Sequence, residues 1–294
     1  MRKIIVCKEA WILIPLCVYL CFLGIALAHQ NDNLAAQETL YSYHTLVWSD
    51  EFDGDTLDSS KWTAMLEDGL SEGYPMHWGN NEAQWYRAEN VFVEDGNLVI
   101  RAKREDYGGM SYTSARITTS ELFAFTYGRV EARIKLPVGY QGLWPAFWAL
   151  PNGLPINWKN GGWSNSGEID AMEAKSRTYE VSGAIHYGNT WPNNVYSAGQ
   201  FVFTYADSFA DWHIFTLEWF HDKMIWYIDG LEYFRVSDWY ATIDGERVGP
   251  PEPFNDLFAL TLNLAIGGNF DDGRLPEASF DYADMLVDWV RVYQ

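Results

Sequence analysis

Residues 223–236 read KMIWYIDGLEYFRV, and this stretch sets the fold class. Asp229-Gly230 stands between two short runs that are rich in β-branched and aromatic residues. An Asp-Gly pair readily adopts the positive φ angles of a two-residue hairpin turn, so it is a strong short-range hairpin signal. We therefore expect two antiparallel strands here. Asp95-Gly96 plays the same part between VFVE and NLVIRAK.

Short strand-like segments separated by turn residues continue over most of the chain beyond Leu46, and no long helical period is convincing. This pattern favours an all-β sandwich over alternating βαβ units, and a jelly-roll sandwich suits a chain of this size. The 294 residues, 48% of them hydrophobic, suffice for one large core. The segments that we predict as strands are Val91–Val93, Asn97–Lys103, Arg129–Leu136, Val181–Tyr187, Gln200–Tyr205, His213–Trp219, Met224–Ile228, Leu231–Val236, Ala259–Ala265 and Leu286–Tyr293.

The first 28 residues differ from the rest of the chain. Three basic residues among the first eight precede an apolar run that ends in Ala26-Leu27-Ala28, a small-x-small cleavage pattern. We interpret residues 1–28 as a signal peptide; the alternative is an uncleaved anchor helix, because the run is about long enough to span a bilayer. Residues 29–45 are polar and predict a flexible arm, and residues 46–294 predict one domain. Both interpretations indicate secretion.

The cysteine content bears on disulfides, and the net charge restricts the classes of molecule that the protein can bind. All three cysteines lie within the first 28 residues, so no disulfide is expected in the secreted chain. The whole chain has a net charge of −20; loss of the leader removes three basic residues and one acidic residue, which leaves 17 basic against 39 acidic residues, or −22. Such a field repels nucleic acid, anionic membranes and sulfated polysaccharides, so we expect none of them as partners after removal of the leader. A neutral glycan meets no such repulsion.

The segment GWSNSGEIDAMEA places the carboxylates Glu168, Asp170 and Glu173 within six residues of an otherwise apolar run. Side chains alternate along a strand, so Glu173 would point away from the other two. A β-bulge at Ala171 or Met172 would return Glu173 to their face. The two glutamates would then lie four strand steps apart, roughly 13 Å between Cα atoms, with carboxyl groups roughly 5 Å apart, as in a retaining glycosidase.

Two carboxyl groups at this separation are expected to hold a proton between them at neutral pH, which gives an acid and a nucleophile from one residue type. Asp170 is placed to hydrogen-bond one of them. The residues alone leave two alternatives open, a site for a hard cation and a solvated strand face. Ile169 and Met172 on the opposite face speak against full solvation.

Aromatic residues provide a second line of evidence. In GLWPAFWAL, Trp144, Ala146 and Trp148 share one strand face, so a small residue separates two indole rings. Flat apolar rings of this kind can stack on the C–H faces of pyranose sugars. Core packing is the alternative, and it is expected to account for most of the 15 tryptophans in the chain.

Five ordered segments resemble family 16 glycoside hydrolases, and within that family the laminarinase-like β-1,3-glucanases. The resemblance extends from about Val47 to Gln294. It implies a concanavalin A-like β-jelly-roll with a concave substrate cleft, and a double displacement that retains anomeric configuration. The partner it implies is a neutral β-glucan polysaccharide, and we expect a monomer. The segments are WSNSGEIDAMEA, YGRVEARIKLPVGYQGLWPAFWAL, GAIHYG, LTLNLAIGGNF and LVDWVRVYQ.

The resemblance also implies roles for the carboxylates. Glu168 would be the nucleophile, Glu173 the general acid/base and Asp170 an assisting carboxylate. His186 in GAIHYG would lie beside the acid/base on the leaving-group side, although a lone strand histidine is more often structural.

Further substrate contacts follow from the same resemblance. Asn80 in GNNEAQWY matches a substrate-contacting asparagine of the family, and Arg116 in SARITTSEL would border the cleft. Trp163 opens the catalytic segment, where the family also has Trp. Ser164 replaces the Pro that usually follows, which leaves the shape of that loop open. Trp144 and Trp148 complete the expected set of substrate-binding residues.

A structural calcium ion is implied on the convex face, bound by Glu51, the Gly96 carbonyl and Asp288. The residues agree in part, because Asp288 alternates with Val290 and Val292, which points a carboxylate where apolar side chains point. An inward carboxylate needs a partner. That partner could equally be an arginine or backbone donors.

The leading hypothesis is a secreted endo-acting hydrolase of β-1,3-glucan, extending to mixed β-1,3/1,4-glucan. A second class is a non-catalytic β-glucan-binding protein on the same fold, but such proteins typically lose the carboxylate set that is complete here. Agarase or carrageenase activity is a third alternative, and the charge of −22 disfavours sulfated substrates. A transglycosylase would differ only in whether water or a sugar hydroxyl resolves the intermediate.

Overall fold

The computed structural model describes residues 43–153, 159–175 and 179–294. The predicted signal peptide and nearly all of the predicted arm lie outside these residues. Thr45–Gln294 forms one compact unit. No helix in the described part of the chain is long and apolar enough to cross a membrane.

The first sheet of the fold has ten strands, antiparallel except where β3 and β6 pair. Their order is β15 (Leu231–Val236), β14 (Met224–Ile228), β13 (Trp212–Trp219), β8 (Gly128–Lys135), β19 (Tyr282–Tyr293), β5 (Asn97–Tyr107), β6 (Met110–Ser114) and β3 (Trp85–Tyr86), with β1 (Leu46–Asp50) beside β19 and β4 (Val91–Glu94) beside β5.

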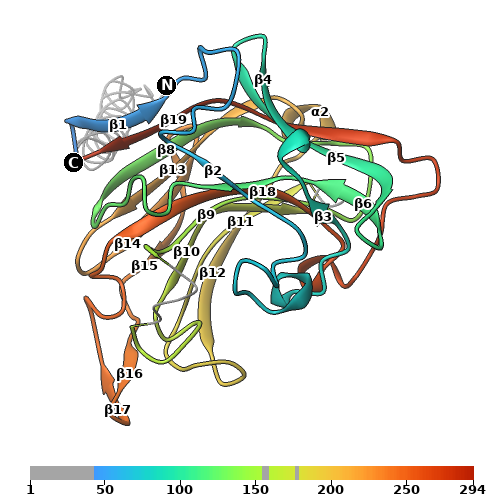
Figure 1. Ribbon diagram of the computed structural model, residues 1–294. Helices are drawn as coiled ribbons and strands as arrows, with labels where there is room; N and C mark the ends of the chain where they lie inside the picture. The colour runs from blue at the N-terminus through green and yellow to red at the C-terminus, as the bar shows by residue number, and fades with distance from the viewer. Residues whose placement is uncertain (1–42, 154–158, 176–178) are drawn as a thin grey trace, which may run out of the picture. The chain divides into compact units, whose positions relative to one another are not determined.

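The second sheet has seven strands and carries the cleft described below. Its order is β12 (Val195–Val202), β11 (Glu180–Tyr187), β10 (Glu168–Lys175), β9 (Leu143–Pro151), β18 (Phe258–Ile266), β7 (Arg116–Thr118) and β2 (Thr63–Met65). Figure 1 shows this sheet packed face to face against the first, with β9 to β12 curving away from it. A separate hairpin of β16 (Ala241–Ile243) and β17 (Glu246–Val248) projects at the lower left of Figure 1.

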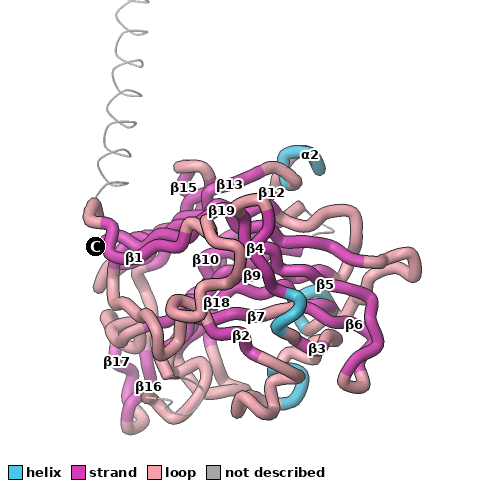
Figure 2. Tube along the Cα trace, turned by 45° about the horizontal axis from the view of Figure 1, so that its top comes forward, coloured by secondary structure: helices cyan, strands magenta, loops and turns pink. Residues whose placement is uncertain are grey.

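Alternate side chains of both sheets build one core. Phe215 of β13, Val287 of β19 and Leu262 of β18 are fully buried in the same apolar cluster. Helical structure in the described residues is limited to α2 (Ala206–Phe209) and the short 3-10 turns η1 (Met76–Gly79), η2 (Ala88–Asn90) and η3 (Asn269–Asp271), which Figure 2 shows in cyan among strands and loops. The predicted all-β jelly-roll sandwich is confirmed.

The hairpin signals are confirmed. Asp229 and Gly230 have φ angles of 50° and 79° between β14 and β15, and Asp95 and Gly96 have 52° and 72° between β4 and β5. Positive φ at both central residues matches the right-handed twist of the flanking strands.

One predicted strand is displaced. Gln200–Tyr205 was expected, whereas β12 covers Val195–Val202 and pairs along its length with β11. The middle of β12 contains Ser197, Ala198 and Gly199, which have little strand propensity. Pairing with β11, rather than local composition, therefore defines this edge strand.

Candidate active site

The bulge that the spacing of the three carboxylates predicts is present in β10. Asp170 pairs with Ala184 of β11 and Glu173 pairs with Ser182, so β10 has one residue more than its partner over this interval. The register with β9 also shifts directly after Asp170, which places the extra residue at Ala171. As a result, all three carboxylates face one cleft.

The cleft has a volume of about 480 Å³. Side chains from β7, β9, β10, β18 and the loops before β3 and β10 line it, and aromatic rings are frequent among them. It is lined by Tyr74, Pro75, Trp78, Gly79, Asn80, Asn81, Glu82, Arg116, Trp144, Ala146, Trp148, Leu150, Trp163, Glu168, Asp170, Glu173, Trp191, Asn263 and Asn269.

Each glutamate accepts one hydrogen bond from an indole. Trp163 Nε1 donates to Glu168 Oε2 at 2.8 Å, and Trp144 Nε1 donates to Glu173 Oε1 at 2.9 Å. Because an indole N–H can only donate, each bond fixes a carboxyl oxygen as an acceptor. The second oxygen of each group remains available for a proton or for a reacting atom.

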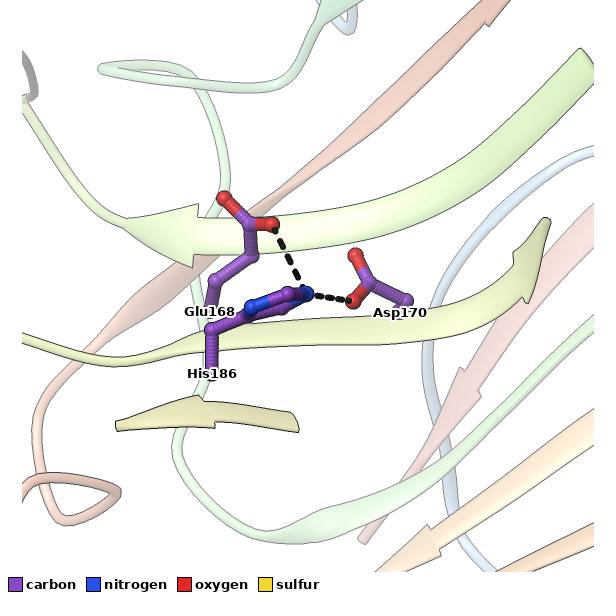
Figure 3. A group of neighbouring side chains, drawn as sticks. All are labelled: Glu168, Asp170 and His186. Atoms are coloured by element: carbon purple, nitrogen blue, oxygen red, sulfur yellow. Dashed lines mark ion pairs between the residues drawn. The ribbon is translucent and has the colours of Figure 1, made fainter. Parts of the chain in front are cut away.

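His186 lies beside the predicted nucleophile. It pairs with Glu168 across β10 and β11, and its Nε2 lies 3.4 Å from Asp170 Oδ2 and 3.9 Å from Glu168 Oε1 (Figure 3). His186 was expected beside the acid/base Glu173, but the register places it directly opposite Glu168, while Glu173 pairs with Ser182. The charge of His186 still acts on Glu173. His186 also does not line the cleft.

Burial and mutual repulsion raise the pKa of both glutamates. Burial, followed by the charge of Asp170, raises the pKa of Glu168 to about 7 and that of Glu173 to about 8. The nearby His186 opposes both shifts. Burial alone would lower the pKa of His186, but its contact with Asp170 and the charge of Glu168 raise it to about 9. Glu173 is therefore the group that retains a proton to the higher pH.

Arg116 of β7 also lines the cleft. Its guanidinium lies over three rings, at 4.4 Å from the centroid of Trp78, 4.6 Å from Trp148 and 5.0 Å from Tyr74. The residue is only 3% exposed. Its Nε and Nη2 are buried and have no hydrogen-bond partner among the described residues.

A chain of hydrogen bonds, in which each donor is defined, connects Trp148 to Glu82. Trp148 Nε1 donates to Asn263 Oδ1 (2.7 Å), so the Asn263 amide nitrogen must donate to Tyr86 Oη (3.1 Å). The Tyr86 hydroxyl then donates to Glu82 Oε2 (3.1 Å).

Two more donors end on the same carboxylate. Gln84 Oε1 accepts the Ile266 backbone N–H, so its Nε2 donates to Glu82 Oε2 at 2.6 Å, and Asn80 Nδ2 donates to Oε1 at 3.3 Å. Burial raises the pKa of Glu82. The three donated hydrogen bonds oppose this shift by favouring the ionised form. Glu82 thus orients Asn80 directly and Trp148 through the chain of hydrogen bonds.

Most of the predicted substrate contacts line the cleft, namely Asn80, Arg116, Trp144, Trp148 and Trp163. One face of the Trp144 ring stacks on Phe270, with centroids 4.9 Å apart and planes 23° apart. The Trp144 indole also positions Glu173 through its hydrogen bond.

Glu82, Asn263 and Trp191 are among the cleft residues that were not singled out from the sequence. Glu82, Gln84 and Tyr86 alternate in GNNEAQWY, and this period of two could have indicated a shared polar face. Trp191, which is 70% exposed beside Trp163, lies in a loop without such a pattern.

Strand pairing places the three predicted calcium positions near one stretch of β19. β5 pairs with β19 as far as Val287 and β1 pairs with it from Val290, so Gly96 and Glu51, each next to the end of its strand, lie toward the segment around Asp288. These oxygen donors suit a calcium ion. Both carboxylates, however, are engaged by arginines, Glu51 with Arg291 and Asp288 with Arg133, and an ion would have to replace these pairs.

The expected inward direction of Asp288 is wrong. Val287, Val290 and Val292 are fully buried, while the Asp288 side chain is 31% exposed. The register of β19 against β8 shifts between Val287 and Trp289, and this bulge interrupts the alternation at Asp288. Its partner is an arginine, one of the alternatives that the sequence left open.

Comparison with known proteins gives consistent results. The family model described as "Glycosyl hydrolases family 16" matches residues 78–255. A glucan endo-1,3-beta-glucosidase A1 of Niallia circulans is 41% identical over 269 residues, which cover 85% of this chain but 38% of that protein. A beta-glucanase of Rhodothermus marinus is 35% identical over 261 residues, 85% of each chain.

Among solved structures, the catalytic domain of an endo-1,3-beta-glucanase (laminarinase) from Thermotoga petrophila RKU-1 is similar, with a TM-score of 0.70 and 36% identity. The match covers 85% of this chain and 97% of that domain.

Proposed function

The chain belongs to family 16 of the glycosyl hydrolases, and from this premise we propose that it is an endo-acting hydrolase of β-1,3-glucan. The observation that supports the proposal most directly is the bulged strand β10, which turns Glu168 and Glu173 into one aromatic-lined cleft. Similarity to proteins named endo-1,3-beta-glucanase supports the choice of substrate.

In the proposed reaction, Glu168 attacks the anomeric carbon while Glu173 donates its proton to the glycosidic oxygen. Water, deprotonated by Glu173, then releases the sugar from Glu168 with retained configuration. The raised pKa of Glu173 keeps its proton available at a pH where Glu168 begins to ionise. The indole bonds from Trp163 and Trp144 hold the two carboxyl groups in place during both steps.

A neutral glucan fits the character of the cleft. Aromatic rings can pack against the apolar sugar faces, and polar side chains of the lining such as Asn80 can bind hydroxyl groups. The charge of −20 on the chain disfavours sulfated or uronate-rich polymers.

Digestion of a panel of polysaccharides tests the function. Purified protein should release oligosaccharides of several lengths from laminarin and curdlan, fewer from lichenan, and none from agarose or carrageenan. A Glu168→Ala variant, with an unchanged melting curve, should release none from any of them. Binding of laminarin without products from the wild type would identify a non-catalytic glucan-binding protein. Elongated products would identify a transglycosylase.

We also propose that the protein is secreted, because the first 28 residues have the charge, apolar run and cleavage pattern of a signal peptide. N-terminal sequencing of protein recovered from the medium should find His29 or a close neighbour as the first residue. Recovery of Met1 on the mature protein would contradict cleavage.

A further inference from the structure

Glu168, Asp170 and His186 each turn one potential ligand atom toward a common point (Figure 3). These three atoms lie within 4.8 Å of one another, and no other group of three His, Cys, Asp or Glu side chains does so among the residues that the structure describes. We propose that the three side chains bind a zinc ion, or a similar borderline divalent cation, which excludes substrate from the cleft.

Two of the three ligand atoms already have the spacing of a tetrahedral zinc site, and the third lies within 4.8 Å of both. Zinc binds histidine nitrogen and carboxylate oxygen at about 2.0 to 2.2 Å, so neighbouring ligand atoms of a tetrahedron lie about 3.4 Å apart. His186 Nε2 and Asp170 Oδ2 are 3.4 Å apart in the absence of any ion. Glu168 Oε1 is 3.9 Å from Nε2 and would need to approach by about 0.5 Å.

The ligand atoms are not committed to other hydrogen bonds. Asp170 is only 2% exposed, and its Oδ2 has no hydrogen-bond partner in the described part of the chain. Trp163 bonds Oε2 of Glu168, which leaves Oε1 toward His186. No hydrogen bond from a described residue restrains His186 Nδ1, so the imidazole can turn by the small amount that coordination requires.

The donor set selects the class of metal. One imidazole and two carboxylates suit zinc, copper, nickel or cobalt, whereas calcium prefers six or more oxygen ligands and magnesium keeps most of its waters. Three protein ligands leave a fourth position for water. An ion bound here would hold the carboxylate that we assign as the nucleophile, so metal and glucan should exclude one another.

Calorimetric titration with zinc chloride tests the site on the intact protein. The wild type should show one site that Mg²⁺ at the same ionic strength does not fill, which separates it from unspecific attraction to an acidic chain. His186→Gln should weaken zinc binding by about tenfold or more, because it removes one of three ligands. His221→Gln is the matched control, since His221 is exposed and its ion-pair partner among the described residues is Asp222, at 3.8 Å. This variant should bind zinc as the wild type does.

Two measurements on the wild type remain decisive even if the His186 variant fails to fold. Cobalt(II) should give the intense visible absorption of a tetrahedral complex, and zinc should displace it. Zinc that binds no better than Mg²⁺, an octahedral cobalt spectrum, or equal zinc affinity in folded His186→Gln would each overturn the proposal.

The exclusion of substrate rests on the proposed function, whereas metal binding does not. Laminari-oligosaccharides should weaken zinc binding in proportion to their own affinity, and zinc should inhibit laminarin hydrolysis competitively. If zinc binds but hydrolysis is absent even in metal-free buffer, the proposed function fails and the metal site stands. If hydrolysis proceeds and zinc does not bind, the reverse holds.

Discussion

At the level of single residues, Glu168 and Glu173 are the same amino acid with the same kind of indole donor, yet their surroundings differ. Glu168 lies next to His186, which offsets part of the repulsion from Asp170. Glu173 lies one bulge farther along β10, and its pKa is raised more strongly. This order of the two pKa values agrees with the proposed roles of Glu168 as nucleophile and Glu173 as acid.

Azide should separate these two roles. Glu168→Ala removes the attacking group, so turnover of an activated aryl glycoside should fall by more than about a thousandfold, and azide should yield the α-glycosyl azide by direct inversion. Glu173→Ala should still form the glycosyl-enzyme with this substrate, stall without a base, and yield the β-azide when azide attacks. The opposite anomers, identified by NMR, would mean that the roles are exchanged.

The pH profile of kcat/KM should report the same pair. Activity should rise with pH as Glu168 loses its proton, near pH 7, and fall as Glu173 loses its proton, near pH 8. With an activated aryl glycoside, which needs no acid to leave, Glu173→Gln should retain the rise and lose the fall. If Glu173→Gln still loses activity at alkaline pH, another group causes that loss, and the matching variant of His186 should be measured next.

At the level of elements, one unpaired residue of β10, Ala171, allows all three carboxylates of this strand to face the cleft. If the same residues formed a regular strand with no bulge, alternation would turn Glu173 toward the core cluster that contains Ile169 and Met172. β9 and β11 on both sides hold the bulge in place through their own register.

Deletions in β10 test this reasoning. Removing Ala171 alone should produce a regular strand that still turns Glu168, Asp170 and Glu173 to one face, with carboxyl groups displaced by about 1 Å and activity reduced by about 100-fold rather than abolished. Removing Ala171 and Met172 together should turn Glu173 into the core and abolish activity. Laminarin hydrolysis and the melting curve of each protein provide the measurement. Equal loss of laminarin hydrolysis in both variants would contradict the conclusion that the bulge determines which face Glu173 occupies.

The loop before β3 depends on β18 in a comparable way. Asn263 of β18 and Tyr86 of β3 connect Trp148 to Glu82. Two separate elements therefore determine how these two cleft side chains are oriented. The carboxylate of Glu82 is the acceptor on which this arrangement depends.

Glu82→Gln should therefore weaken substrate binding more than chemistry. Glu82 accepts three hydrogen bonds, and the NH₂ group of a glutamine would face at least one of their donors. A buried polar group would then lack a partner, at a cost of about 1 to 3 kcal/mol. KM for laminari-oligosaccharides should rise by about tenfold while kcat changes by less than about threefold. Glu180→Gln, which alters an exposed bond to Gln200 far along β11, is the control. An unchanged KM would exclude the positioning role.

At the level of the whole molecule, two large sheets around one core support the fold without a disulfide, since the described residues contain no cysteine. The junction of β1, β5 and β19 is the place where a bound ion could add stability. Two carboxylates and a backbone carbonyl gather there, each carboxylate paired with an arginine.

We predict that calcium raises the melting temperature through this junction. Ligand at about 100 times its dissociation constant stabilises the native state by about 2.7 kcal/mol, which corresponds to roughly 5 to 10 °C here. Asp288→Ala should abolish the difference between calcium and chelator. Asp284→Ala removes a similar ion pair, with Arg101, elsewhere on β19 and should preserve it. Identical melting curves of the wild type in calcium and chelator would reject the site.

Much of the fold was determined by local patterns in the sequence. Period-two segments, the Asp-Gly turns and the lack of helical periodicity indicated the β-sandwich, and the spacing of Glu168, Asp170 and Glu173 indicated the bulge. These features are readable because turn geometry and strand alternation act over a few neighbouring residues.

Only the tertiary structure decided which side chains meet across strands. The partner of His186 follows from the register of β10 against β11, and the partner of Asp288 follows from a bulge opposite β8. Asn263 and Tyr86 are 177 residues apart in the sequence and hydrogen-bonded in the fold. Such contacts depend on how distant strands align, and a shift of one residue would reverse the face of every side chain. No local pattern carries that information.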